Sequence, residues 1–159
     1  MICFNDKTGK QWTIDLNLGT AKRVKAECGV DLINIINFDK DGVDTTILQQ
    51  LSDDAYLLVA VLFSLCKKQV VESGLDEDSF AEVFDAEAIE NAVDALIKEI
   101  INFSQPVKKK MLTLIYEKTR NFKARAEQHL DSLISSKEFQ DGMEEQLNKL
   151  LTNTQESSE

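Results

Sequence analysis

The sequence predicts an α+β fold, mostly α-helical, in which an N-terminal β-hairpin packs on a bundle of about five helices. Apolar residues alternate with polar ones over the first 18 residues and recur at three-to-four spacing in most of the rest. The chain has only six Gly and one Pro, and so few breakers favour helices. Hydrophobic residues make up 43% of the chain, which is ordinary for a folded domain.

Residues 1–18 are predicted to form the hairpin, because two alternating runs each present one apolar face. Gly9 stands in the turn between the runs, where a left-handed residue is needed. A lone hairpin is marginal in water, so Trp12 is expected either in the core or as an anchor for a partner. The apolar members of the two runs are Ile2, Phe4, Trp12, Ile14, Leu16 and Leu18.

Helices are predicted over residues 20–134. Thr20 is expected to cap the first helix and Gly29 to end it, and Asp31 to cap a short second helix. Residues 38–44 are predicted to be a polar loop, followed by a short helix near residues 47–51.

The longer helices follow. Ser52 or Asp53 is predicted to cap a central apolar helix that Gly74 ends. Its apolar run, residues 56–66, is too short to cross a bilayer core of about 30 Å, so we expect a buried core helix and no membrane association.

An acidic connection leads to a helix that Asp85 caps, and Pro106 is predicted to begin the next helix. These elements are expected to form a single domain over residues 1–135. After a loss of register at Ser135 and Ser136, we predict an amphipathic helix over 136–152 and a disordered tail over 153–159.

The net charge is −10, which makes the chain a poor candidate for binding nucleic acid. The charge is unevenly spread. Residues 107–125 hold seven basic side chains against Glu117 alone, giving +6, and residues 72–99 hold ten acids against Lys98, giving −9. The two segments are expected either to pair within the fold or to leave a polarised surface that steers a charged partner.

Three lysines, 108–110, stand in the first turn of a predicted helix, where the helix dipole disfavours cations. Either the acidic helix over residues 85–103 or an acidic partner is expected to neutralise them. The residues expected to contact a partner are Lys108, Lys109, Lys110, Arg120 and Trp12.

Motifs for catalysis or metal binding are lacking. The single histidine, His129, has no nucleophile motif beside it, and no zinc-ligand spacing occurs. An acidic loop begins at Asp39 like a calcium loop, but Gly42 comes early and Gln50 replaces the required Glu. Three widely spaced cysteines indicate reduced thiols and no disulfide framework. We therefore expect no catalytic residue, no cofactor, no metal and no signal peptide.

Three runs carry a resemblance to a known family: GKQWTIDL at residues 9–16, LGTAKRVK at 18–25 and GVDL at 29–32. Together they resemble the opening of tail assembly chaperone-like proteins of long-tailed bacteriophages. The resemblance continues more loosely to about Arg125.

The resemblance implies a non-enzymatic assembly factor that acts in the host cytoplasm and is absent from the finished particle. Its implied partners are the tape-measure protein and the tail-tube protein, with self-association as a further option. Two other functions stay open from the residues alone. One is an acidic DNA mimic that blocks a nucleic-acid-binding enzyme, and the other is a small enzyme of unknown chemistry.

Overall fold

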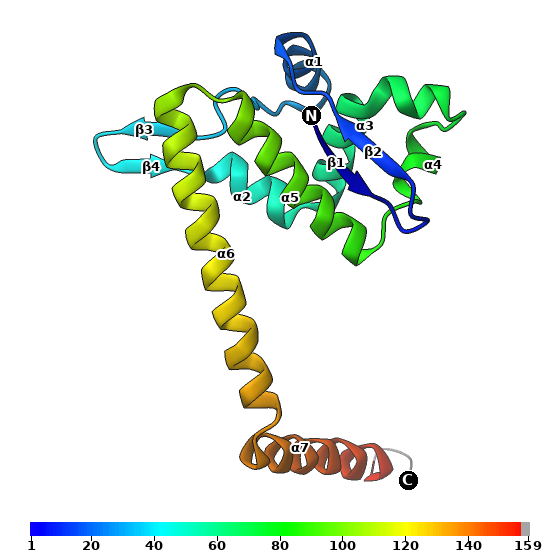
Figure 1. Ribbon diagram of the computed structural model, residues 1–159. Helices are drawn as coiled ribbons and strands as arrows, with labels where there is room; N and C mark the ends of the chain where they lie inside the picture. Colours follow the sequence, from blue (N-terminus) through cyan, green and yellow to red (C-terminus); the bar gives the residue numbers. More distant parts are fainter. Residues whose placement is uncertain (157–159) are drawn as a thin grey trace. The chain divides into compact units, whose positions relative to one another are not determined.

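The computed structural model describes residues 1–156 (Figure 1) and confirms an α+β fold that is mostly helical. The described residues form seven helices, which is more than the predicted five, and two β-hairpins. The chain divides into two compact units, Met1–Leu114 and Ile115–Glu159. The first unit therefore ends about 20 residues before the domain boundary predicted at residue 135.

The N-terminal hairpin forms as predicted from β1, Ile2–Asn5, and β2, Gln11–Ile14, with Phe4 opposite Trp12. Gly9 in the turn has φ of 84°, the left-handed conformation that the turn needs. The Trp12 side chain is fully buried. Its ring meets Phe80 of α4, Glu77–Ala81, edge to face at 5.0 Å.

Two helices cover the hairpin. Strand β1 packs against α5, Ala86–Phe103, and β2 packs against α3, Ala55–Glu72. The Gln69 side chain of α3 accepts a hydrogen bond from the Thr13 N–H at 3.0 Å and donates one to the Thr13 carbonyl at 2.7 Å. The side-chain amide of Gln69 thus forms hydrogen bonds with both the N–H and the carbonyl of Thr13, which face outward from β2.

Helix α1, Leu18–Cys28, is capped by Asn17 and not by Thr20. The Asn17 side chain accepts from the Thr20 N–H, and the Thr20 hydroxyl accepts from the Asn17 N–H, which is a capping box. Thr20 is therefore the third residue of the helix. Gly29 ends the helix as predicted, with φ of 72°.

The short helix predicted at Asp31 does not form. Its carboxylate instead accepts hydrogen bonds from the backbone N–H groups of Ile33 and Asn34, which holds the segment in a turn. The apolar residues of this turn are nevertheless buried: Leu32, Ile35 and Ile36.

A second hairpin replaces the predicted polar loop. It consists of β3, Asn37–Asp39, and β4, Gly42–Asp44, and all six residues are exposed. The Asp39 carboxylate accepts from the N–H groups of Asp41 and Gly42 and so closes the turn. The acidic residues here therefore build a turn, as Asp side chains commonly do.

Helix α2, Thr46–Asp53, precedes α3, whose cap is Asp54 and neither Ser52 nor Asp53. The predicted cap Asp85 of α5 and the predicted start of α6 at Pro106 are both correct.

The central apolar helix is buried as expected, with Leu58, Val61 and Leu62 fully enclosed. In the described part of the chain, no helix is long and apolar enough to cross a membrane.

Helix α6 spans Pro106–Ile134 and belongs to the first unit only up to Leu114. Helix α7, Lys137–Glu156, is longer than the helix predicted over 136–152. Residues 153–156 are helical although they were predicted to be disordered, and the hydroxyls of Thr152 and Thr154 bond to carbonyls one turn back. The rest of the predicted tail, 157–159, lies outside the described residues.

Candidate functional site

The predicted site begins with the lysines at the start of α6, and Lys108 has a structural role. Its side chain is half-buried, and its Nζ donates to the Asn34 side-chain oxygen at 2.9 Å and to the Ile33 carbonyl at 3.3 Å. These bonds tie the start of α6 to the turn before β3. Lys108 is therefore occupied within the first unit.

Lys109, Lys110 and Arg120 are exposed. Among residues 1–154, whose side chains the structure describes, no carboxylate pairs with any of them, and none pairs with Lys108. The acidic helix α5 uses Asp94 for a 2.6 Å ion pair with its own Lys98. Of the two alternatives for these lysines, an ion pair with α5 is therefore not formed, and the exposed cations remain open to an acidic partner.

Trp12 was expected in the core or, alternatively, at an interface. The structure confirms the core position, because the side chain has no exposed surface. Its assignment as a partner-binding residue is therefore wrong for this fold, and the three exposed basic residues and Trp12 do not form one site.

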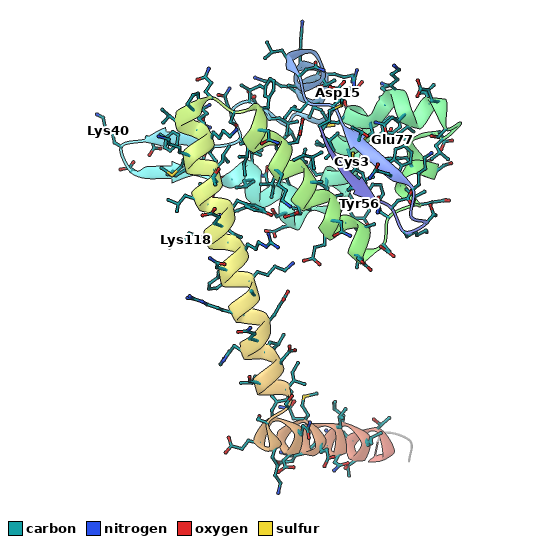
Figure 2. All side chains as sticks on the ribbon, in the orientation of Figure 1. Cys3, Asp15, Lys40, Tyr56, Glu77 and Lys118 are labelled. Atoms are coloured by element: carbon teal, nitrogen blue, oxygen red, sulfur yellow. The ribbon has the colours of Figure 1, made fainter. Side chains whose placement is uncertain are left out.

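The second unit carries an apolar stripe on each of its helices, and both stripes are exposed to solvent. The α6 residues Phe122 and Leu130 are 75% and 53% exposed, and Leu147 and Leu150 of α7 are 53% and 64% exposed. Figure 2 shows the side chains of both segments directed outward from their helices. Other members of the stripe are also exposed: Leu133, Ile134, Phe139, Met143 and Leu151.

The stripe has the same spacing in both helices. Phe122, Ala126, Leu130 and Leu133 are separated by four, four and three residues, and Phe139, Met143, Leu147 and Leu150 repeat this spacing 17 residues later. In a helix these intervals keep all four side chains on one face. This repeat was not predicted from the sequence, although it is visible when residues 122–134 are aligned with residues 139–151.

Leaving such an apolar stripe exposed to water forgoes the free energy that its burial would contribute. Burial of a Leu, Phe or Met side chain contributes about 1.5–3 kcal/mol, and a contiguous apolar patch on a folded protein usually marks an interaction site. The stripe is therefore the strongest candidate for a functional surface. We define the stripe surface as the exposed apolar side chains of residues 122–151.

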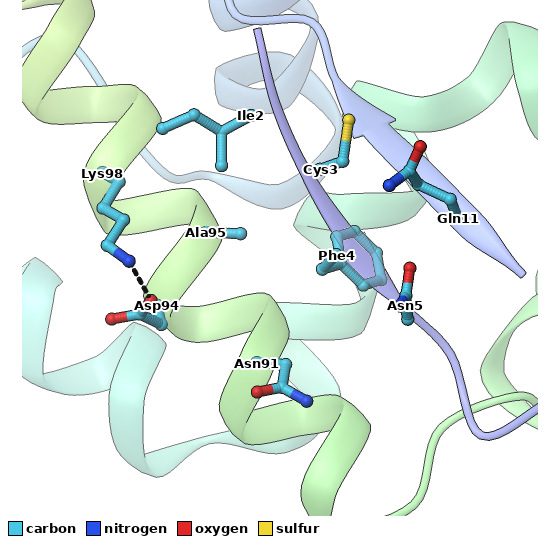
Figure 3. A pocket seen from close by; sticks show the side chains of 9 residues that line it. All are labelled: Ile2, Cys3, Phe4, Asn5, Gln11, Asn91, Asp94, Ala95 and Lys98. Atoms are coloured by element: carbon cyan, nitrogen blue, oxygen red, sulfur yellow. Dashed lines mark ion pairs between the residues drawn. The ribbon is translucent and has the colours of Figure 1, made fainter. Parts of the chain in front are cut away.

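A second candidate is an open hollow of about 340 Å³ between β1 and α5 (Figure 3). Its polar lining consists of carboxamides, the exposed thiol of Cys3 and the Asp94–Lys98 ion pair. The Cys3 thiol lies 3.4 Å from the Thr13 hydroxyl. No histidine or second carboxylate lines the hollow to activate the thiol, so it offers no acid–base arrangement.

Other chemistry-bearing groups are dispersed. His129 is exposed on α6, and in the described residues no three His, Cys, Asp or Glu side chains gather as a metal would require. Glu99 is a buried carboxylate, and the N-terminal amine lies 4.0 Å from its Oε2.

Comparison with known protein families, curated proteins and solved structures finds no match to this chain.

Proposed function

We propose that this protein is a tail assembly chaperone that binds the tape-measure protein and the tail-tube protein without catalysing a reaction. The observation that carries the proposal is the stripe surface, which presents apolar side chains at helical spacing along α6 and α7. Such a face suits the apolar side of another amphipathic helix. The kind of partner comes from the resemblance of residues 9–32 to phage tail assembly chaperones.

A tape-measure protein is expected to consist of long helices with apolar stripes that need cover before the tail is built. The stripe surface would supply that cover, and the exposed Arg120 of the same unit would steer an acidic partner toward it. On this proposal the protein acts in the host cytoplasm and is absent from the mature virion.

An acidic DNA mimic is a weaker proposal. Such a protein needs a continuous acidic face, and the exposed cations of α6 interrupt one. No specific feature of the hollow beside β1 favours an enzyme.

The test is binding of the purified protein to a purified tape-measure fragment, measured by calorimetry. Leu147→Asp with Leu150→Asp places charge inside the stripe surface, and we expect at least a tenfold loss of affinity, or about 1.4 kcal/mol. Asn148→Asp with Asn153→Asp adds the same charge elsewhere on α7 and serves as the control. Equal affinity of wild type and the double Leu variant would rule out the stripe surface as the binding site.

A further inference from the structure

The two helices of the second unit differ in the residues that border their apolar stripes. The α6 stripe consists of Phe122, Ala126, Leu130 and Leu133, and the α7 stripe consists of Phe139, Met143, Leu147 and Leu150. Successive residues of a helix are turned by about 100° around its axis. The spacing along the sequence therefore shows which side chains stand beside each stripe.

One border of the α6 stripe is cationic. Lys118 precedes Phe122 by four residues and Arg125 follows it by three, which turns both by about 40–60° from Phe122, on the side away from Leu130. Both side chains are exposed (Lys118 is labelled in Figure 2), and no carboxylate of residues 1–154 pairs with either. Two cations about 10.5 Å apart along the helix thus flank the apolar residues.

The acidic residues of this part of α6 do not lie on that border. Glu117 and Asp131 are turned by about 145–175° from the middle of the stripe, so they lie on the opposite face of the helix. Glu127 lies toward the second border, one turn after Lys123, where opposite charges attract each other. An excess of positive charge is therefore confined to the border that holds Lys118 and Arg125.

The α7 stripe repeats the apolar face of α6 without these cations. Seventeen residues after Arg125 stands Gly142, and seventeen after Lys118 stands Ser135, which precedes the helix. The side chains nearest to the α7 stripe on its two sides are uncharged amides: Gln140, Gln146 and Asn153. The two stripes therefore present similar apolar faces with different charges beside them.

We propose that the α6 stripe selects an amphipathic helix with two acidic residues seven positions apart along one border of its apolar face, whereas the α7 stripe has no charge preference. Such a helix places its carboxylates opposite Lys118 and Arg125, because seven residues span the same length in both helices. Complementary charges at the rim of an apolar contact favour one partner over another. The inference rests on the proposed function, since it takes the stripe surface as the site for a partner helix.

A basic amphipathic helix can instead lie on an anionic membrane. The second unit suits a helical partner better. Residues 115–156 hold six basic and eight acidic residues, a net charge of −2, so an anionic surface would repel the unit as a whole.

Two labelled synthetic peptides test the selection. Both form an amphipathic helix with Leu at the spacing of the α6 stripe, and they differ only in carrying either two Glu or two Lys residues seven positions apart on one border. Fluorescence anisotropy with the full chain should show about tenfold tighter binding of the Glu peptide at low salt, and a smaller difference at high salt. Non-specific attraction to a chain of net charge −10 would favour the Lys peptide, so a preference for Glu reports the local border.

Variants locate the preference. Lys118→Gln with Arg125→Gln should reduce it to within about threefold. Lys137→Gln with Lys149→Gln removes the same charge from α7 and is the matched control that should keep the preference. Circular dichroism checks that the helices persist. Equal binding of the two peptides by the wild type, tighter binding of the Lys peptide, or a preference that survives the loss of Lys118 and Arg125 overturns the inference.

These outcomes are distinct from those that test the proposed function. A chain that selects the Glu peptide and does not bind a tape-measure fragment keeps the inference and loses the proposed partner. A chain that binds the fragment without distinguishing the peptides does the reverse. Vesicles of phosphatidylglycerol and phosphatidylcholine are the third probe. Vesicle binding that Lys118→Gln with Arg125→Gln abolishes, in a chain that binds neither peptide, would assign the border to a membrane surface and overturn the inference.

Discussion

The indole Nε1 of Trp12 donates a 2.9 Å hydrogen bond to Oδ2 of Asp6, so the hairpin turn is joined to the buried tryptophan of its own second strand. The other carboxylate oxygen accepts from the Thr8 N–H, the Thr8 hydroxyl and the Lys10 N–H. Asp6 is only 6% exposed, yet both its oxygens are satisfied. One carboxylate therefore fixes both the turn and the orientation of the largest core side chain.

Replacement of Trp12 should destabilise the first unit strongly. Trp12→Ala removes a fully buried ring and leaves the Asp6 oxygen without its indole donor, so we expect a loss of about 3–5 kcal/mol in the free energy of unfolding. Urea unfolding followed by circular dichroism measures it. Tyr56→Ala is the control, because Tyr56 is 91% exposed and its loss should change stability by less than about 0.5 kcal/mol. Similar urea midpoints for the Trp12 and Tyr56 variants would contradict the buried packing of Trp12.

Stability should fall in acid. Burial alone would raise the pKa of Asp6, but hydrogen bonds from Thr8 and Trp12 outweigh it and hold that pKa below its usual value. The bond from Lys25 lowers the pKa of Asp31 to about 2. Because both values are depressed in the folded state, the ionised groups stabilise the fold above about pH 4, the unfolded value. That contribution is lost as pH falls toward the folded pKa.

Urea unfolding between pH 7 and pH 2.5 checks this pH dependence. Asp6→Asn removes one of the two groups, so its free energy of unfolding should vary less with pH over this range than that of the wild type. An identical pH dependence of the variant and the wild type would show that Asp6 does not contribute.

The three lysines of α6 should differ in their effect on stability. Lys108→Met removes the donor to Asn34 and Ile33, and we expect a loss of about 1–2 kcal/mol. Lys109→Met and Lys110→Met remove exposed charges and should change stability by less than about 0.5 kcal/mol. Thermal melts of the three single variants measure the difference. Equal melting temperatures would mean that the Lys108 bonds contribute nothing.

The three thiols should react with alkylating agents in order of exposure. Burial raises the pKa of Cys66 to about 12, so almost no thiolate is present at pH 8. Burial also raises the pKa of the half-buried Cys28, whereas Cys3 is exposed. Mass spectrometry after iodoacetamide treatment should show Cys3 modified first and Cys66 only in denaturant. Early modification of Cys66 would indicate that α3 opens readily.

The first unit should fold without the second. A chain that ends after Leu114 retains the buried Leu112 and the Lys108 bonds, so we expect a cooperative thermal transition within a few degrees of that of the full chain. Differential scanning calorimetry measures it. A broad transition or loss of the near-ultraviolet Trp signal would show that residues 115–159 help to hold the first unit together.

Much of the fold could be predicted because its signals are local. Gly29, Asp85 and Pro106 mark helix ends through their own backbone and capping chemistry, and period two alone identifies the N-terminal hairpin. Errors arose where several residues could serve the same role. Asn17 and Thr20 can both cap a helix, and their mutual hydrogen bonds decide the boundary.

The candidate site depended on contacts that are distant in sequence. The partner of Lys108 lies 74 residues away, at Asn34, and no pattern in the sequence links the two. Either α5 or an acidic partner was expected to neutralise the lysines, and Asp94 of α5 instead pairs with Lys98 one turn away. The apolar stripe of α7 was predicted from the sequence. Its exposure to solvent was not predicted, because periodicity alone does not show whether an apolar face has a packing partner.

The Gln69 amide that bonds to Thr13 has a consequence for solubility. A two-stranded ribbon normally leaves backbone donors and acceptors free, and these can recruit a strand from another molecule and begin an aggregate. Here the Gln69 side chain of α3 presents a donor and an acceptor to Thr13, as the backbone of a neighbouring strand would. It therefore takes the position that a third strand would have beside β2. The outer edge of β2 is thus closed to edge-to-edge growth at Thr13 without any added strand.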